Sequence, residues 1–116
     1  MRKMAFESAL LAKRTQEALG EFRKGVEKVY GKRLERVVLF GSWARGDATQ
    51  DSDIDVLVVL AGKVVPGKEI DRMIDVITEV NLTYGVLVAV NPVSARDYAS
   101  LKSPLLMNVR REGKVA

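Results

Sequence analysis

Two residue types are missing from this chain of 116 residues, cysteine and histidine. Without cysteine, the chain has no disulfide, no catalytic thiol and no zinc–thiolate site. Without histidine, it has neither imidazole acid–base chemistry nor a histidine-ligated metal. Any chemistry must therefore use carboxylates, hydroxyls, lysine, arginine and the backbone, and any metal must be a hard cation with oxygen ligands.

Long apolar runs are missing too, since none approaches the roughly 20 residues that span a bilayer. The N-terminus has no apolar core of the signal-peptide type, so we expect an intracellular, cytoplasmic protein. Charge is not gathered into a block: 19 Lys and Arg oppose 15 Asp and Glu, for a net charge of +4. This balance suits an anionic ligand such as a nucleotide, but it does not by itself indicate nucleic-acid binding.

The length of the chain and its 47% hydrophobic content are typical of one globular domain, so we expect residues 1–116 to form a single domain. Apolar periodicity predicts the order of elements. They are a helix at 5–30, a strand at 36–40, a short helical turn at 42–46, a strand at 53–60, a helix at 68–82, a strand at 86–90, a helix at 94–101 and a last helix from 104 that ends before 113. This order predicts an α+β fold, a small mixed β-sheet flanked by helices.

Several residues are expected to set the boundaries of these elements. Ser42 and Ser94 are candidate helix N-caps, and Asn91-Pro92 is expected to end the third strand. Apolar side chains at helical spacing are expected to face the core. In the first helix these are Phe6, Leu10, Leu19, Phe22, Val26 and Tyr30, and in the helix at 68–82 they are Ile70, Ile74, Ile77 and Val80.

Asp53 and Asp55 stand two residues apart at the start of the most apolar strand. Side chains at i and i+2 of a strand point to the same face, so the two carboxylates should be neighbours, with Ile54 on the other face. A divalent cation would relieve their repulsion, and Mg²⁺ is usually held by one or two carboxylates together with substrate phosphates. The alternative is that both are ordinary polar residues at a solvated strand end.

Gly41-Ser42 follows the preceding strand directly. Glycine lets the backbone approach a phosphate closely, and the N–H groups of the turn together with the Ser42 hydroxyl can donate to it. Arg45 is either a further phosphate ligand or a solvated surface residue. Trp43 either stacks on a base or packs in a half-buried position.

The string Phe40-Gly41-Ser42, ten residues and then Asp53-Ile54-Asp55-Val56 resembles the signature of the DNA polymerase β-like nucleotidyltransferase superfamily. The longer strings at 41–46 and 52–58 are similar to its minimal branch, the MNT proteins. The resemblance implies the nucleotidyltransferase fold. It also implies that Gly41 and Ser42 bind the phosphates of a nucleoside triphosphate, with ATP expected.

The same resemblance implies that Asp53 and Asp55 are the catalytic metal ligands, for one or two Mg²⁺ ions. Arg45 and Ser52 of the motif are further candidates for nucleotide binding. The implied reaction is transfer of a nucleotidyl group to an acceptor hydroxyl, with pyrophosphate leaving. Proteins of this branch often act as antitoxins beside a helical HEPN partner, so such a partner and a homo- or hetero-oligomer are implied as well.

The sequence departs from the family at one point, because active members usually carry a third carboxylate on a later strand. The candidate strand at 86–90 contains no acid. Three functions therefore stay open: an active nucleotidyltransferase, a noncatalytic nucleotide-binding or antitoxin module, and an interaction domain without a ligand. The C-terminal stretch at 105–113 either faces a partner or packs its apolar residues Leu105, Leu106 and Val109 on the chain's own sheet.

Overall fold

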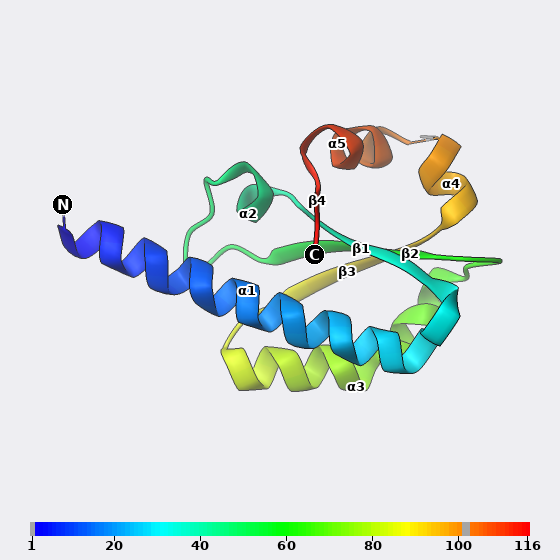
Figure 1. The fold of residues 1–116 in the computed structure, drawn as a ribbon, viewed down its shortest axis with the longest axis horizontal. Coiled ribbons are helices and arrows are strands. Elements are labelled where there is room, and N and C mark those ends of the chain that lie inside the picture. Colours follow the sequence, from blue (N-terminus) through cyan, green and yellow to red (C-terminus); the bar gives the residue numbers. More distant parts are fainter. Residues whose placement is uncertain (1, 101–102) are drawn as a thin grey trace.

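The structure is a computed structural model that describes residues 2–100 and 103–116, with side chains described from residue 11 onward. The expected α+β fold is confirmed (Figure 1). Its elements are α1 (Arg2–Tyr30), the 3-10 turn η1 (Gly31–Arg33), β1 (Leu34–Phe40), α2 (Ser42–Arg45), β2 (Ile54–Leu60), α3 (Pro66–Tyr84), β3 (Val88–Ser94), α4 (Ala95–Ser100), α5 (Pro104–Glu112) and β4 (Lys114–Val115). No helix in these ranges is long and apolar enough to cross a membrane.

The four strands form one mixed sheet in the order β3-β2-β1-β4. β2 and β3 are parallel, whereas β1 runs antiparallel to both of its neighbours. β4 was not predicted, because two residues are too few to show a strand period. It pairs Val115 with Val38 and Lys114 with Leu39, which fixes the end of the chain to the sheet.

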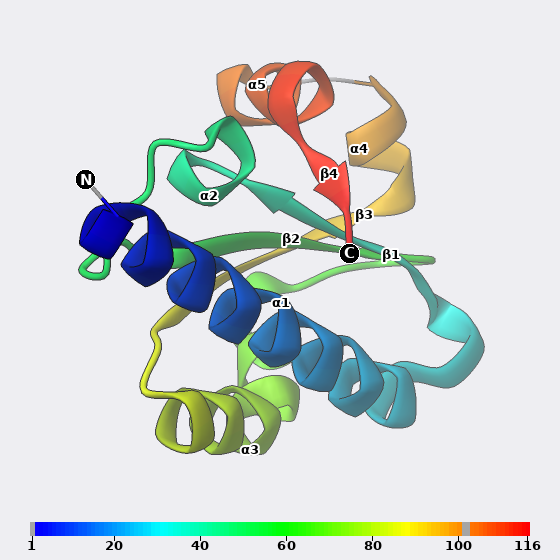
Figure 2. The ribbon, with the colours of Figure 1, turned by 60° about the vertical axis from the view of Figure 1, so that its left-hand side comes forward.

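The two faces of β2 are covered by different helices, with α1 and α3 on one side and α4 and α5 on the other (Figures 1 and 2). Even-numbered residues from Ile54 to Leu60 join the core under α1 and α3. Leu57 and Val59 point the other way and pack with Leu106 and Val109 of α5. A strand buried on both faces reads as a continuous apolar run, which is why β2 carries the strongest strand signal in the sequence.

The inward stripe predicted for α1 is confirmed where side chains are described: Leu19, Phe22 and Val26 are buried and Tyr30 is half-buried. The side chains of Phe6 and Leu10 lie outside the described part. On α3, Ile77 and Val80 are buried as predicted, and Ile70 is half-buried.

The inward prediction for Ile74 is wrong, since its side chain is 48% exposed. Met73, which is fully buried, takes the inward position instead. Residues 73, 77 and 80 are separated by four and three, so they form one stripe that faces the core. Ile74 is rotated about 100° from Met73 and falls outside that stripe.

α3 begins at Pro66, two residues before the predicted start, and the buried carboxylate of Glu69 accepts the N–H of the N-cap residue Val65 at 3.4 Å. Glu69 is 3% exposed, and its carboxylate also accepts hydrogen bonds from the Tyr30 hydroxyl (3.1 Å) and Arg33 Nη1 (3.3 Å). Burial alone would raise the pKa of Glu69, but the bonds from Arg33, Tyr30 and Val65 lower it overall. Burial and the neighbouring carboxylate raise the pKa of Tyr30 to about 12. This cluster ties the end of α1 to the start of α3.

The third strand lies later than predicted, because β3 runs through Asn91 and Pro92 to Ser94 instead of ending before them. β3 is an edge strand, where a proline without an N–H is tolerated on the side that has no partner strand. The predicted cap is confirmed, since Ser94 Oγ accepts the Asp97 N–H at 3.1 Å. The predicted end of that helix at Leu101 lies outside the described residues.

The last helix begins at Pro104 and ends before Gly113, as predicted. Leu106 and Val109 are buried against the sheet, which confirms the packing interpretation for these two residues, and Leu105 is 39% exposed.

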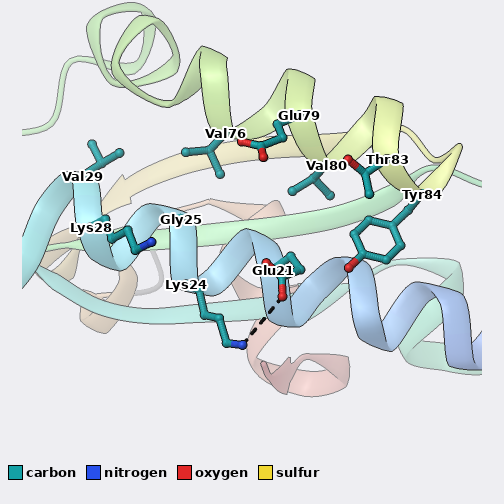
Figure 3. A pocket seen from close by; sticks show the side chains of 10 residues that line it. All are labelled: Glu21, Lys24, Gly25, Lys28, Val29, Val76, Glu79, Val80, Thr83 and Tyr84. Atoms are coloured by element: carbon teal, nitrogen blue, oxygen red, sulfur yellow. Dashed lines mark ion pairs between the residues drawn. The ribbon is translucent and has the colours of Figure 1, made fainter.

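A groove of about 430 Å³ lies between α1 and α3 (Figure 3). Gly25 faces Val76 there, and a Cβ added at Gly25 would stand 2.4 Å from Val76 Cγ1. Lys24 and Glu21 form an ion pair of 3.7 Å at its rim. The groove lies on the face of the sheet away from α5, so its walls do not include the motif carboxylates.

Candidate functional site

The two halves of the sequence motif meet where β1 ends and β2 begins. Phe40 pairs with Asp55 across these antiparallel strands, so the Gly41-Ser42 turn starts beside the Asp55 carboxylate. The approach is very close: a Cβ added at Gly41 would lie 2.3 Å from Asp55 Oδ2. The prediction that adjacent strands bring turn and acids to one end of the sheet is confirmed.

Asp55 lies on the α5 side of the sheet, because β2 alternates and Ile54 before it is buried on the α1 side. The strand begins at Ile54, so Asp53 precedes it by one residue and is exposed, while Asp55 is half-buried. Burial, and then the charge of Asp53, raise the pKa of Asp55, and the Arg45 guanidinium opposes this shift. A bound cation would favour the ionised form of both acids.

The turn before α2 has a backbone that only glycine adopts readily. Gly41 has φ 74° and ψ −154°, and Gly46, which ends α2, has φ 84° and ψ 13°. The prediction that Ser42 is the N-cap is wrong, because Gly41 holds that position and Ser42 is the first helical residue. The glycine backbone fits the close approach to Asp55, and a serine at the cap would not.

Arg45 lies at the open side of the site, about half exposed. Its Nε pairs with Asp47 Oδ2 and its Nη1 with Glu112 Oε1, both at 3.3 Å. The guanidinium charge opposes the rise in the pKa of Asp55.

Trp43 and Ser52 connect α2 to the loop that leads into β2. Trp43 is half-buried, packs on the core and donates its Nε1–H to the Ser52 carbonyl at 3.4 Å, which agrees with the packing interpretation. The Ser52 hydroxyl accepts the Thr49 N–H at 2.9 Å. Ser52 therefore shapes the loop that carries Asp53.

A recess of about 300 Å³ opens on the other side of Asp53, between α1, Trp43 and the segment before β3. Thr15 and Arg14 line it. Within the described part of the chain, Thr15 Oγ1 and Arg14 Nε are buried and have no hydrogen-bond partner. Sequence reasoning missed this wall because α1 lies far from the motif in the chain. The feature that could have indicated it is Thr15, a polar residue in the buried stripe of α1.

β3, the parallel neighbour of β2, carries no acid, as the sequence indicates. Ala89 is the residue that pairs with Asp55, so an alanine methyl stands where a carboxylate from this strand would meet the pair. Among the described residues, no group of three acids is placed to hold a metal ion. The pair itself is the oxygen donor set that Mg²⁺ takes when phosphates and waters complete its coordination.

A third carboxylate instead approaches the turn from α5. Glu112 Oε1 accepts the Gly41 N–H at 3.3 Å and pairs with Arg45 Nη1 (Figure 2 shows α5 beside α2). No local spacing indicates this contact, because Glu112 and Gly41 are 71 positions apart in the chain.

Comparison with known proteins adds a family match. The model of the nucleotidyltransferase domain family matches residues 14–99. Two proteins of Methanocaldococcus jannaschii, named as candidate protein adenylyltransferases MJ0604 and MJ0141, are similar in sequence. The first is 41% identical over 73 residues, which cover 63% of this chain and 67% of the relative. The second is 38% identical over 74 residues, which cover 63% and 73%.

Two solved structures are similar in fold. One is a toxin–antitoxin crystallised with AMP-PNP, with a TM-score of 0.61 and 20% identity, covering 83% of this chain and 69% of that chain. The other is a toxin–antitoxin MntA–HpeT mutant, with a TM-score of 0.53 and 16% identity, covering 87% and 70%. At these identities the likeness concerns the fold alone.

Proposed function

Because the chain belongs to the nucleotidyltransferase domain family, we propose that it binds a nucleoside triphosphate with Mg²⁺ and transfers the nucleotidyl group to an acceptor hydroxyl. The observation that carries this proposal is the contact between the two motif halves, in which the Asp55 carboxylate lies against the backbone of Gly41. A phosphate on the turn would therefore lie within reach of a cation held by the acids.

The residues of the site fit a divalent cation. Asp53 and Asp55 place two carboxylates together, and burial and the charge of Asp53 raise the pKa of Asp55. Bound Mg²⁺ would bring positive charge to the pair and stabilise the phosphates as negative charge develops. Gly41 and Ser42 would orient the phosphates, Arg45 would pair with one of them, and Asp53 and Asp55 would hold the metal. The polar recess beside Asp53 is our proposed place for the nucleoside.

In the proposed reaction the acceptor oxygen forms a bond to the α-phosphorus. The bond between that phosphorus and the bridging oxygen of the β-phosphate breaks, pyrophosphate leaves with the electron pair, and the hydroxyl proton passes to solvent. The names of the relatives support ATP as donor and a protein as acceptor. The toxin–antitoxin neighbours support a protein partner, for which we propose a HEPN-type toxin and an antitoxin role for this chain, acting as a single domain.

The test compares transfer from ATP labelled at the α-phosphate with transfer from ATP labelled at the γ-phosphate, in the presence of Mg²⁺. Label should be retained on protein only from the α-position. Asp53→Asn and Asp55→Asn should each reduce transfer about 100-fold or more. Asp75→Asn is the matched control, because it removes the same charge from an exposed position on α3, across the sheet. Equal transfer by the wild type and both site variants would refute the proposal.

The second candidate is a noncatalytic module that keeps the nucleotide or the partner surface without turnover. The alanine opposite Asp55 favours it, since no carboxylate from β3 is available to activate an acceptor. Thermal melting separates the two candidates. A Mg²⁺-dependent stabilisation by ATP that Asp53→Asn removes, in a protein that transfers no α-label, would support the noncatalytic module.

A further inference from the structure

Glu112 is a charged residue at the site that the proposed reaction does not use. It is the last residue of α5, and its side chain is 22% exposed. Its Oε1 accepts from the Gly41 N–H and contacts Arg45 Nη1, each at 3.3 Å. These two donors are among those proposed for a nucleotide phosphate.

The C-terminal segment holds Glu112 in this place from both sides. Leu106 and Val109 anchor α5 on the sheet, and β4 pairs with β1 directly after Gly113. Gly113 is tightly enclosed, because an added Cβ would lie 2.4 Å from the Val109 carbonyl oxygen and 2.6 Å from Val38 Cγ1. Beyond β4, the Ala116 N–H bonds to the Val37 carbonyl at 2.8 Å. The position of Glu112 is therefore built into the fold.

We propose that Glu112 competes with the nucleotide phosphate for the Gly41 N–H and Arg45, and so makes the site select metal-bound over metal-free nucleotide. The proposal rests on the proposed function, since it assumes that the turn binds phosphate. Carboxylates and phosphates are both oxyanions, and the same N–H and the same guanidinium edge cannot serve both at once.

Charge explains the selection. Asp55 lies against the Cα of Gly41 while Glu112 occupies its N–H, and Asp53 precedes Asp55 by two residues at the start of β2. A triphosphate without metal brings more negative charge to three carboxylates, whereas Mg²⁺ removes much of that repulsion.

The contact is weak enough to be displaced. Both of its distances are long for charge-assisted hydrogen bonds, and Arg45 is 48% exposed. Exposed ion pairs of this kind correspond to about a two- to fivefold change in an equilibrium constant, and the backbone bond adds to it. We therefore expect removal of Glu112 to tighten Mg-ATP binding about three- to tenfold.

The experiment measures ATP dissociation constants by calorimetry, with Mg²⁺ and with EDTA, for the wild type, Glu112→Ala and Glu112→Gln. Both variants should bind more tightly than the wild type, and the gain should be larger without metal. Glu112→Gln should lie between the other two, because its amide oxygen still accepts from Gly41 but carries no charge. Asp75→Asn should match the wild type, although it makes the same change in net charge as Glu112→Gln.

A second measurement reports on the contact itself. In ¹H–¹⁵N spectra, the Gly41 amide signal should shift in Glu112→Ala, and added Mg-ATP should bring wild type and variant to a similar position. Thermal melting should show that all variants stay folded.

The outcomes separate this proposal from the proposed function. If the wild type binds ATP and Asp53→Asn abolishes this binding, the proposed function stands. Equal or weaker binding by Glu112→Ala than by the wild type would then overturn only the competition. Unchanged affinity with lost transfer would also overturn it, because it would make Glu112 a catalytic residue. Binding by Glu112→Ala but not by the wild type would support the competition strongly, and no binding by either would overturn both proposals.

Discussion

Replacing Gly41 by alanine tests the geometry of the site more directly than removing an acid. The substitution adds one methyl group at the point where the turn and the carboxylate meet. That methyl would start 2.3 Å from Asp55 Oδ2 and 3.2 Å from its Cγ. The φ of 74° with ψ of −154° is also a backbone conformation that alanine rarely adopts.

Two terms set the size of the effect. The unfavourable backbone conformation costs about 1–3 kcal/mol, and forcing a methyl into filled space costs about 1–3 kcal/mol more unless Asp55 swings away. We expect a total loss of about 2–6 kcal/mol in the free energy of unfolding. For a chain of 116 residues, 1 kcal/mol corresponds to about 4 °C in Tm, so Gly41→Ala should melt about 8–24 °C lower.

Gly46→Ala is the matched control, since Gly46 also has a positive φ but an added Cβ there would meet no atom within 4 Å. It should cost only the backbone term, about 1–2 kcal/mol. Urea unfolding of both variants measures the difference directly. A double-mutant cycle with Asp55→Ala isolates the clash: once Asp55 is truncated, Gly41→Ala should cost about 1–3 kcal/mol less than in the wild type.

Gly41→Ala should also lose Mg-ATP binding, because the displaced Asp55 carboxylate can no longer face the metal position. The reasoning is wrong if Gly41→Ala costs no more than Gly46→Ala and the cycle with Asp55→Ala is additive. That result would mean that the Asp55 carboxylate does not lie against Gly41.

Three further predictions concern titration and helix packing. The folded-state pKa of Asp55 is raised, so its charge opposes folding above that pKa. In urea unfolding, Asp55→Asn should therefore be more stable than the wild type at pH 7, and this difference in stability should disappear as the pH falls towards 3.8. The pKa of Glu69 is lowered, so its ionised carboxylate stabilises the fold above pH 4.5, and this stabilisation is lost as the pH falls through the folded-state pKa. Glu69→Gln should therefore be less stable than the wild type at pH 7. A difference in stability that does not shrink in acid would contradict this. Gly25→Ala should destabilise the protein through contact with Val76, and Val76→Ala should rescue it. Gly20→Ala is the control, because an added Cβ there meets nothing within 4 Å, and it should stabilise the protein by up to about 1 kcal/mol. Higher melting temperatures for both glycine variants would contradict the close approach of α1 and α3.

Local pattern was enough to predict much of the fold. The core stripe of α1, the doubly buried β2 and the limits of α5 follow from apolar spacing and from proline and glycine positions, which are properties of neighbouring residues. The errors came where another element decides. Ile74 is exposed because α1 covers only the neighbouring stripe, and β3 continues through Pro92 because the strand lies at the sheet edge.

The sequence by itself determined the chemistry that this chain can offer. The lack of histidine and cysteine limits the site to carboxylates, hydroxyls, lysine, arginine and the backbone, and the spacing of Asp53 and Asp55 and the glycine after β1 indicate which of these groups form it. These features are visible because each depends on residue type and on short spacing.

Only the tertiary structure decided which groups surround that site. The pairing of Phe40 with Asp55 brings the acid onto Gly41, and the anchoring of α5 and β4 brings Glu112 to the same glycine. Thr15 and Arg14 form the far wall of the recess because α1 crosses the sheet. Contacts of this kind join different elements of the chain, and no local spacing encodes them, because they depend on how whole elements pack.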